Sequence, residues 1–179
     1  TKLMVQVVES GTKWFKMAQE WLRYTGMKQQ GNRGLIMFMG EYNHTIDAKG
    51  RLIIPSKFRE LLGEEFVLTK GLDGCLSIYP MDEWESFEMK LRALPLTNKN
   101  ARTFSRFFVA GATTCELDRQ GRILVPQTLR KFAGLEKDVV LTGNLNRIEV
   151  WSKEKWNEIC DYDDMDSIAE SMQDLGITI

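Results

Sequence analysis

An internal repeat is the feature of this sequence that most limits the folds open to the chain. The segment 47–55, DAKGRLIIP, recurs 71 residues later as 118–126, DRQGRILVP. At the same offset Arg59 matches Arg130, and Gly63 matches Gly134. Self-similarity over about forty residues indicates two copies of one supersecondary unit. The fold must therefore be one that two such units can build together.

Each copy is predicted to form a β-turn-β-α-β-β unit. Asp47 and Asp118 at the first place of a turn, with Gly50 and Gly121 at the fourth, suit a type I turn followed by a left-handed glycine. The apolar residues after each turn predict a short buried strand, so that the turn closes a β-hairpin. An apolar face with i, i+3, i+4 spacing then predicts a short helix. Two further strands are expected near 66–70 and 75–79 in the first copy, and near 138–142 and 147–151 in the second.

One such unit is near the lower size limit for burying its own apolar surface. We therefore expect an α+β fold in which the two copies pack on each other around a pseudo-two-fold axis, with peripheral helices. The expected organisation is unit 1 over 41–83, connecting helices over 84–111, unit 2 over 112–155 and an acidic amphipathic helix over 156–179. Thr97 is the expected N-cap of the second connecting helix.

Residues 1–36 lie outside the repeat. The spacing of Trp14, Ala18, Trp21 and Leu22 predicts a short amphipathic helix. A new start is indicated at Met37, in the string Met37-Phe38-Met39-Gly40. Our hypothesis is that the natural start is Met37 and that 1–36 is an upstream extension. A genuine additional helix is the alternative.

Composition excludes several classes of protein. The 179 residues are 43% hydrophobic and 27% charged, which predicts a soluble globular protein. No apolar run approaches the ~20 residues that span a bilayer, so no membrane partner is expected. Three distant cysteines argue against a disulfide framework. His44 is the only histidine, and it is interpreted as a strand residue beside the turn, so neither a metal site nor a cofactor is expected.

Catalytic motifs are also missing from the sequence. It contains no phosphate-binding loop of the GxxxxGK[ST] type, no HExxH motif and no nucleophile elbow. We therefore expect that the chain is not an enzyme.

Charge is distributed unevenly along a chain whose net charge is only -1. Residues 1–36 hold six basic and two acidic residues, and 153–179 hold two basic and eight acidic ones. The stretch between them is nearly neutral, with sixteen basic and fifteen acidic residues. A neutral body with an acidic tail can still carry a local basic face.

Several short strings together resemble the MraZ family. They are Met37-Phe38-Met39-Gly40, the doubled Asp-x-x-x-Arg, the run 71–75 (GLDGC), and 106–108 (RFF) ahead of 111–113 (GAT). The similarity runs from Met37 to about Ile179. Met39 departs from some relatives, which carry Arg there, and this removes one possible phosphate contact.

The resemblance implies both a fold and a function. The fold would be a tandem pair of SpoVT/AbrB-like units forming a duplicated swapped-hairpin β-barrel. MraZ proteins are bacterial, cytoplasmic, nucleoid-associated transcriptional regulators that bind double-stranded DNA. The expected function is repression through short direct repeats upstream of the division and cell-wall gene cluster, by a homo-oligomeric ring.

By the same resemblance, the two Asp-x-x-x-Arg segments are the DNA-binding elements. Arg51 and Arg122 lead, because a guanidinium forks onto phosphate or onto guanine O6 and N7 and stays charged. Asp47 and Asp118 are expected to orient the turns. Further phosphate contacts are expected from Lys49, Arg119, Lys57, Arg59 and Arg130. The structural alternative is that both Asp-Arg pairs are surface salt bridges, worth ~0–1 kcal/mol each.

A second function stays open beside DNA binding. Antitoxins share the AbrB-type fold and bind a partner protein through a tail, and the acidic stripe 154–174 would suit that role. Two fused copies and ordered middle helices favour the regulator instead.

Overall fold

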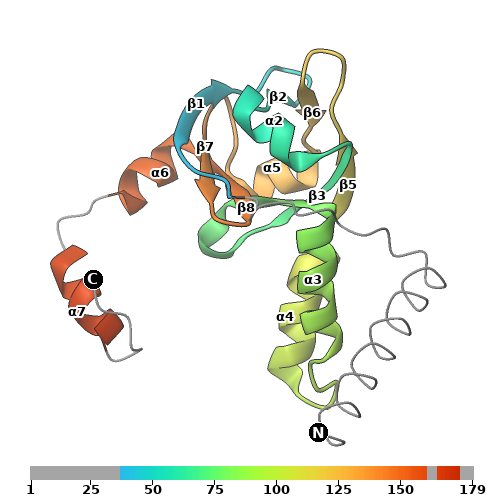
Figure 1. Ribbon diagram of the computed structural model, residues 1–179, viewed down its shortest axis with the longest axis vertical. Helices are drawn as coiled ribbons and strands as arrows, with labels where there is room; N and C mark the ends of the chain where they lie inside the picture. The colour runs from blue at the N-terminus through green and yellow to red at the C-terminus, as the bar shows by residue number, and fades with distance from the viewer. Residues whose placement is uncertain (1–36, 161–164, 174–179) are drawn as a thin grey trace, which may run out of the picture. The chain divides into compact units, whose positions relative to one another are not determined.

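The computed structural model describes residues 37–160 and 165–173 of the chain, in an α+β fold (Figure 1). The helix predicted near Trp14 lies in residues 1–36, outside the described residues. The elements are β1 (Glu41–Thr45), β2 (Arg51–Ile53), α2 (Ser56–Leu62), β3 (Glu65–Lys70), a 3-10 turn (Leu72–Gly74), β4 (Leu76–Pro80), α3 (Met81–Arg92), α4 (Lys99–Val109), β5 (Thr113–Glu116), β6 (Arg122–Leu124), α5 (Gln127–Ala133), β7 (Asp138–Asn144), β8 (Arg147–Ser152), α6 (Lys153–Ile159) and α7 (Met165–Gln173).

The order of the strands has pseudo-two-fold symmetry. Six strands form one antiparallel sheet in the order β1-β7-β8-β4-β3-β5, and β2 pairs with β6 in a separate two-stranded ribbon. The first copy supplies β1 to β4 and the second supplies β5 to β8. By the repeat, β1, β3 and β4 correspond to β5, β7 and β8. When each strand is replaced by its counterpart, the order of the sheet is the same read from the other end. At the centre, Ser77 of β4 lies opposite Glu149 of β8.

The two copies exchange the strands that flank their turns. Across the mouth of each turn a backbone bond runs from Asp47 N to Arg51 O at 3.0 Å and from Asp118 N to Arg122 O at 2.9 Å, and in the first copy Ile46 and Leu52 also form an isolated antiparallel bridge. Beyond these contacts, β1 pairs with β7 and β5 pairs with β3, while β2 pairs with β6. The simple hairpin predicted from the turn is therefore wrong beyond the contacts that flank the turn. Each copy completes its strand pairing, and buries its apolar faces, only with the other copy.

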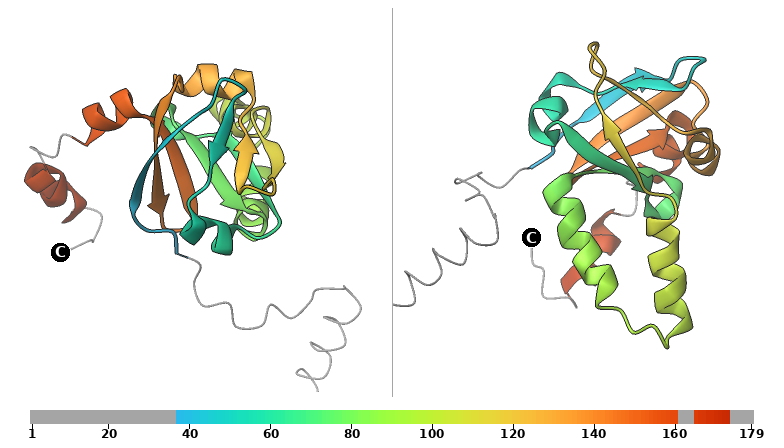
Figure 2. Two further views of the ribbon diagram at one scale, coloured as in Figure 1. Left: turned by 90° about the horizontal axis from the view of Figure 1, so that it is seen from above. Right: turned by 90° about the vertical axis from the view of Figure 1, so that its right-hand side faces the viewer.

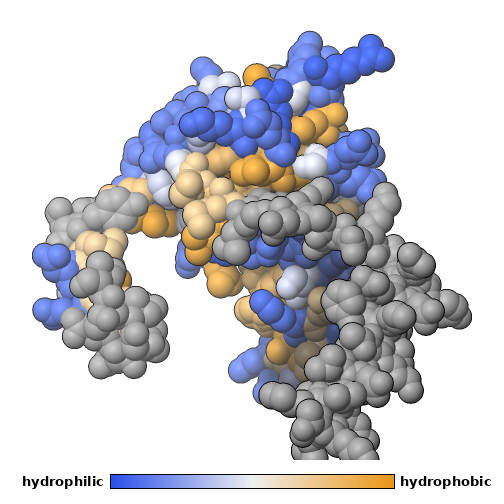
Figure 3. Space-filling model, in the orientation of Figure 1, coloured by the Kyte–Doolittle hydropathy of each residue, from blue (hydrophilic) through white to orange (hydrophobic). Residues whose placement is uncertain are grey.

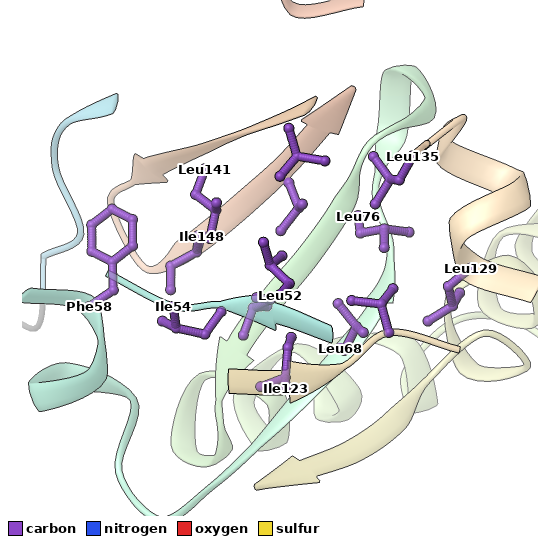
Figure 4. Close-up of a cluster of buried hydrophobic side chains, with 14 of the residues drawn as sticks. Leu52, Ile54, Phe58, Leu68, Leu76, Ile123, Leu129, Leu135, Leu141 and Ile148 are labelled. Atoms are coloured by element: carbon purple, nitrogen blue, oxygen red, sulfur yellow. The ribbon is translucent and has the colours of Figure 1, made fainter. Parts of the chain in front are cut away.

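The hydrophobic core lies between the ribbon and the six-stranded sheet (Figure 4). Leu52 of β2 and Ile123 of β6 are direct partners in the ribbon and are 0% and 1% exposed. They lie in one cluster with Leu68, Leu76 and Ile148 of the sheet. Full burial of such side chains contributes about 1.5–3 kcal/mol each. The ribbon is thus held firmly by its inward side, which leaves its outward side to solvent.

Short helices follow the ribbon strands, and their apolar faces are buried as the spacing predicts. Phe58 and Leu62 of α2 are buried, as are Leu129 and Ala133 of α5. In the connecting region, α3 and α4 run antiparallel, away from the sheet (Figure 2).

Aromatic packing and one hydrogen bond anchor this helical hairpin. The rings of Phe87 and Phe108 meet edge to face at 5.0 Å, and Thr69 Oγ1 donates to Phe108 O at 2.7 Å. The predicted N-cap Thr97 is wrong by one residue. Asn98 caps α4 instead, because its carboxamide oxygen accepts from Asn100 N and Ala101 N.

The described part of the C-terminal region, residues 153–160 and 165–173, contains two helices. α6 begins at Lys153 and packs Trp156 against Trp151, with ring centroids 5.9 Å apart. α7 follows after residues 161–164, which lie outside the described residues, as do 174–179. Within the described ranges, no helix has the length and apolar character needed to cross a bilayer.

Candidate nucleic-acid interface

The first turn is organised by one carboxylate. Asp47 Oδ1 accepts from Lys49 N and Arg51 N, both at 2.9 Å, in the pattern of an Asx turn. Its Oδ2 accepts from Arg51 Nε at 2.6 Å and forms an ion pair with Nη2, also at 2.6 Å. Gly50 N donates to Asp47 O at 2.8 Å, and the φ of Gly50 is +83°. The carboxylate therefore fixes both the turn and the direction of the guanidinium.

The second turn repeats this geometry. Asp118 Oδ1 accepts from Gln120 N at 2.8 Å and from Arg122 N at 3.0 Å. Its Oδ2 accepts from Arg122 Nε at 2.8 Å and pairs with Nη2 at 2.7 Å. Gly121 takes a φ of +73°. The repeat in the sequence is thus a repeat in atomic contacts.

These contacts lower the pKa of both carboxyl groups. The pKa of Asp118 falls to about 2, chiefly because the Arg122 side chain donates to it. The pKa of Asp47 is lowered chiefly by the Arg51 backbone N–H, with the Arg51 side chain adding to the effect. Both aspartates are therefore charged at neutral pH. Each occupies Nε and one Nη2 hydrogen of its arginine, and the guanidinium carries three further N–H donors.

Both arginines project from the outward side of the ribbon. Side chains alternate along a strand, so the residues beside buried Leu52 and Ile123 face outward. We call this outward set the ribbon face, and its members are Arg51, Ile53, Arg122 and Leu124. Arg51 lies opposite Leu124, and Arg122 lies opposite Ile53. The two arginines are therefore diagonal neighbours, a relation that places residues about 7–8 Å apart and their Cβ atoms somewhat closer.

Three of the other predicted site residues lie near the ribbon face. Lys49 and Arg119 are exposed in the two turns, and Lys57 is exposed at the start of α2. The surface at the upper end of the molecule in Figure 3, where Figure 1 labels β2 and β6, is largely hydrophilic. Arg51 and Arg122 are each paired with an aspartate, so these exposed cations add positive charge beside the two ion pairs.

Arg59 and Arg130 have a different setting, behind the turns of the opposite copy. A Cβ added to Gly50 would lie 2.9 Å from Arg130 Cζ, and one added to Gly121 would lie 2.7 Å from Arg59 Cζ. Arg130 Nε donates to Val125 O at 3.1 Å, whereas Arg59 Nε is buried without a hydrogen-bond partner. Each guanidinium thus lies against the turn of the other copy. Phosphate contact by these two residues stays a prediction.

Ile53 and Leu124 are the residues of this surface that the sequence interpretation missed. They are 45% and 63% exposed, whereas the apolar run after each turn predicts a short buried strand. The available signal was strand alternation: with Leu52 and Ile123 buried, every second residue must face outward.

No group of three or more His, Cys, Asp or Glu side chains suited to a metal ion occurs among residues 37–160 and 165–173. Burial raises the pKa of the Cys75 thiol to about 12 and lowers the pKa of His44. The raised pKa keeps Cys75 as the weakly nucleophilic thiol at neutral pH, and the lowered pKa keeps the His44 imidazole neutral.

Both copies of the repeat match one known protein family. The family described as "MraZ protein, putative antitoxin-like" matches residues 37–107 and again residues 108–176. The chain belongs to the MraZ family. This agrees with the resemblance found in the sequence, and the exchanged strands confirm the α+β, swapped-hairpin fold expected for duplicated AbrB-like units.

Close relatives cover most of the chain. "Transcriptional regulator MraZ" of Clostridium beijerinckii is 60% identical over 142 residues, which are 79% of this chain and 100% of the relative. The proteins of the same name from Thermoanaerobacter sp. and Clostridium tetani are 59% and 60% identical, again over 79% of this chain and 100% of theirs. These MraZ relatives are named as regulators and not as enzymes, in agreement with the expectation for this chain.

A solution structure of a Pyrococcus horikoshii protein is also similar, with a TM-score of 0.28 and 18% identity over 63% of this chain and 87% of that one. That score is too low to support an argument about either fold or function.

Proposed function

We propose that this chain is a transcriptional regulator that binds double-stranded DNA through the ribbon face and its two turns. The observation that carries the proposal is the juxtaposition of Arg51 and Arg122 on one exposed surface, each aimed by its own aspartate. Its MraZ relatives, named as transcriptional regulators, support the same function.

A two-stranded ribbon suits the major groove, which is wide enough to admit it. On this proposal the free donors of Arg51 and Arg122 contact guanine edges or phosphates, and exposed Lys49, Arg119 and Lys57 contact phosphates. On the ribbon face, Leu124 lies opposite Arg51 and Ile53 lies opposite Arg122. The exposed side chains of Leu124 and Ile53 are suited to contact with thymine methyl groups.

Oligomerisation completes the proposal. One chain offers few basic contacts, so its own affinity should be modest and sensitive to salt. A ring of copies on short direct repeats upstream of the division and cell-wall genes would raise avidity by ~10²–10⁴-fold. In this role the protein is cytoplasmic, associated with the nucleoid, and a repressor of its own gene cluster.

The test is a salt-titrated mobility shift with DNA from upstream of the protein's own gene. Arg51→Ala and Arg122→Ala should each abolish the shift on repeat DNA, while a scrambled-repeat DNA should bind neither the variants nor the wild type specifically. Arg92→Ala is the matched control, because Arg92 forms an equally short i,i+4 ion pair, with Glu88 at 2.6 Å, on α3. If Arg51→Ala and Arg122→Ala both still bind the repeat DNA, the proposal is wrong.

The salt dependence then separates two kinds of contact. Loss of one phosphate contact lowers the slope of log K against log[salt] by about 0.9. Loss of a base contact costs about 1–3 kcal/mol at one position of the site and leaves the slope nearly unchanged. Lys49→Ala and Arg119→Ala should behave in the first way.

Binding of a partner protein through the acidic C-terminal region is the second candidate, favoured by the exposure of Met165 and Ile168 on α7 at 44% and 48%. Affinity capture with full-length protein, and again with Ile168→Asp, tests it. A partner protein lost with that substitution, together with no DNA shift, would favour the antitoxin-like function.

A further inference from the structure

The helical hairpin carries a groove that the DNA-binding proposal does not use. The α3–α4 groove, as we name it, has a volume of about 370 Å³. Apolar side chains of Leu94, Leu96, Ala101 and Val109 line it together with Arg102 and Arg106. Leu96 is 80% exposed and Val109 is 50% exposed. Apolar patches are visible on this hairpin in Figure 3. Grooves of this kind mark interaction sites.

Helix α7 presents a surface of the complementary kind. Met165, Ile168, Ala169 and Met172 follow i, i+3, i+4, i+7 spacing and form an apolar stripe along one side. Met165 and Ile168 remain exposed. At nine residues, α7 is shorter than the ~12–15 residues at which an isolated helix becomes even marginally stable. A helix this short needs a surface that covers its apolar stripe.

The charges of the two surfaces are opposite in sign and equal in spacing. Arg102 and Arg106 lie four residues apart on α4, and Asp166 and Glu170 lie four residues apart on α7. Both pairs therefore repeat at about 6 Å along their helix axes. The chain around α7 is strongly acidic, with eight acidic and two basic residues over 153–179.

We propose that α7 of one copy lies in the α3–α4 groove of a second copy, with its apolar stripe on the groove and Asp166 and Glu170 against Arg102 and Arg106. Such a contact joins two different surfaces, so it is heterologous and extends into a ring or a chain of copies. The proposal rests on the oligomeric form of the proposed function and supplies its contact.

The position of α6 favours a second copy over the chain's own groove. α6 packs on β7 and β8, while α3 and α4 pack on β3 and β4 in the other half of the sheet. Residues 160–164 join α6 to α7 and tether α7 within about 20 Å of the end of α6. Binding of α7 to the chain's own groove is therefore the alternative that the mixing experiment must exclude.

Charge reversal with mixing tests the contact, with molar mass measured by light scattering after size-exclusion chromatography. The groove variant carries R102E and R106E, and the helix variant carries D166K and E170K, both in the full chain. Each should lose at least half of the wild-type mass. An equimolar mixture should recover it, because each altered surface then meets an oppositely charged partner.

Matched controls keep the result interpretable. A variant with K90E and K99E changes the same number of charges outside the groove and should keep the wild-type mass. Ile168→Ser changes only an exposed side chain of α7 and should lower the mass, with a loss of helical circular dichroism no larger than the nine residues of α7 account for. This variant therefore still tests the contact if the groove variant fails to fold.

Two results would overturn the proposal. One is an unchanged mass in both the Ile168→Ser and helix variants. The other is a reduced mass that mixing does not restore, the outcome expected if α7 binds its own groove or a different partner. Failure here is separable from failure of DNA binding, because the helix variant keeps its ribbon face and should still shift DNA at low salt.

Discussion

A methyl group added at Gly121 should test whether Arg59 braces the second turn. Gly121 has a φ of +73°, and an alanine Cβ there would lie 2.8 Å from Arg59 Cδ and 2.7 Å from Cζ. Left-handed backbone costs a non-glycine residue about 1–2 kcal/mol. Forcing extra atoms into occupied space costs about 1–3 kcal/mol more. The Gly121→Ala variant should therefore lose about 2–5 kcal/mol of unfolding free energy.

Gly134→Ala is the matched control for backbone strain alone. Gly134 has a φ of +65°, and a Cβ there meets nothing within 4 Å. This variant should lose only about 1–2 kcal/mol. The double variant Gly121→Ala with Arg59→Ala should lose less than the sum of its single variants, because shortening Arg59 makes room for the methyl group.

Urea denaturation at one protein concentration measures all four variants, since oligomerisation makes apparent stability depend on concentration. DNA binding by Gly121→Ala should weaken as well, because the turn that aims Arg122 is displaced. Equal losses for Gly121→Ala and Gly134→Ala, with strictly additive effects in the double variant, would show that Arg59 does not brace the turn.

Three further predictions concern charge, base contact and burial. The folded pKa of Asp118, about 2, is below its ordinary value of 3.8, so its stabilising effect is complete above that value and is lost as the pH falls toward 2. The difference in melting temperature between wild type and Asp118→Asn should be constant from pH 5 to 7 and shrink below pH 4; a constant difference down to pH 2 would contradict this. Replacing thymine by uracil in the repeat DNA should weaken wild-type binding, and the same replacement should have a smaller effect on Leu124→Ser; equal effects would exclude the methyl contact. In a variant with Cys115→Ser and Cys160→Ser, the remaining thiol of Cys75, 2% exposed and with a pKa raised to about 12, should react with a thiol reagent at pH 8 only as fast as the chain opens. Immediate reaction would show that Cys75 is accessible.

Much of the local structure could be predicted because local chemistry decides it. An aspartate followed three residues later by glycine specifies the turn through bonds within five residues. The i, i+3, i+4 spacing around Phe58 and Leu129 likewise specifies which face of each short helix is buried. The N-cap of α4 was misplaced by one residue, because Thr97 and Asn98 both suit a cap and only the geometry of the chain chooses between them.

The partners of the turns could not be predicted in the same way. A single unit predicts a hairpin, yet both flanking strands pair with the other copy, because only the second copy supplies unpaired strand edges and apolar surface at the right place. The same exchange turns Ile53 and Leu124 outward and carries Arg59 and Arg130 to the turns of the opposite copy.

The sequence by itself determined that there are two units, that each has an aspartate-arginine turn, and which residues form the apolar faces. Tertiary structure alone decided that Arg51 and Arg122, 71 positions apart, share one exposed surface. The physical reason is the distance along the chain between the residues whose contacts decide each feature. Turns and helix faces are fixed by neighbours a few residues away, whereas the ribbon face exists only after two distant strands pair and bury Leu52 against Ile123.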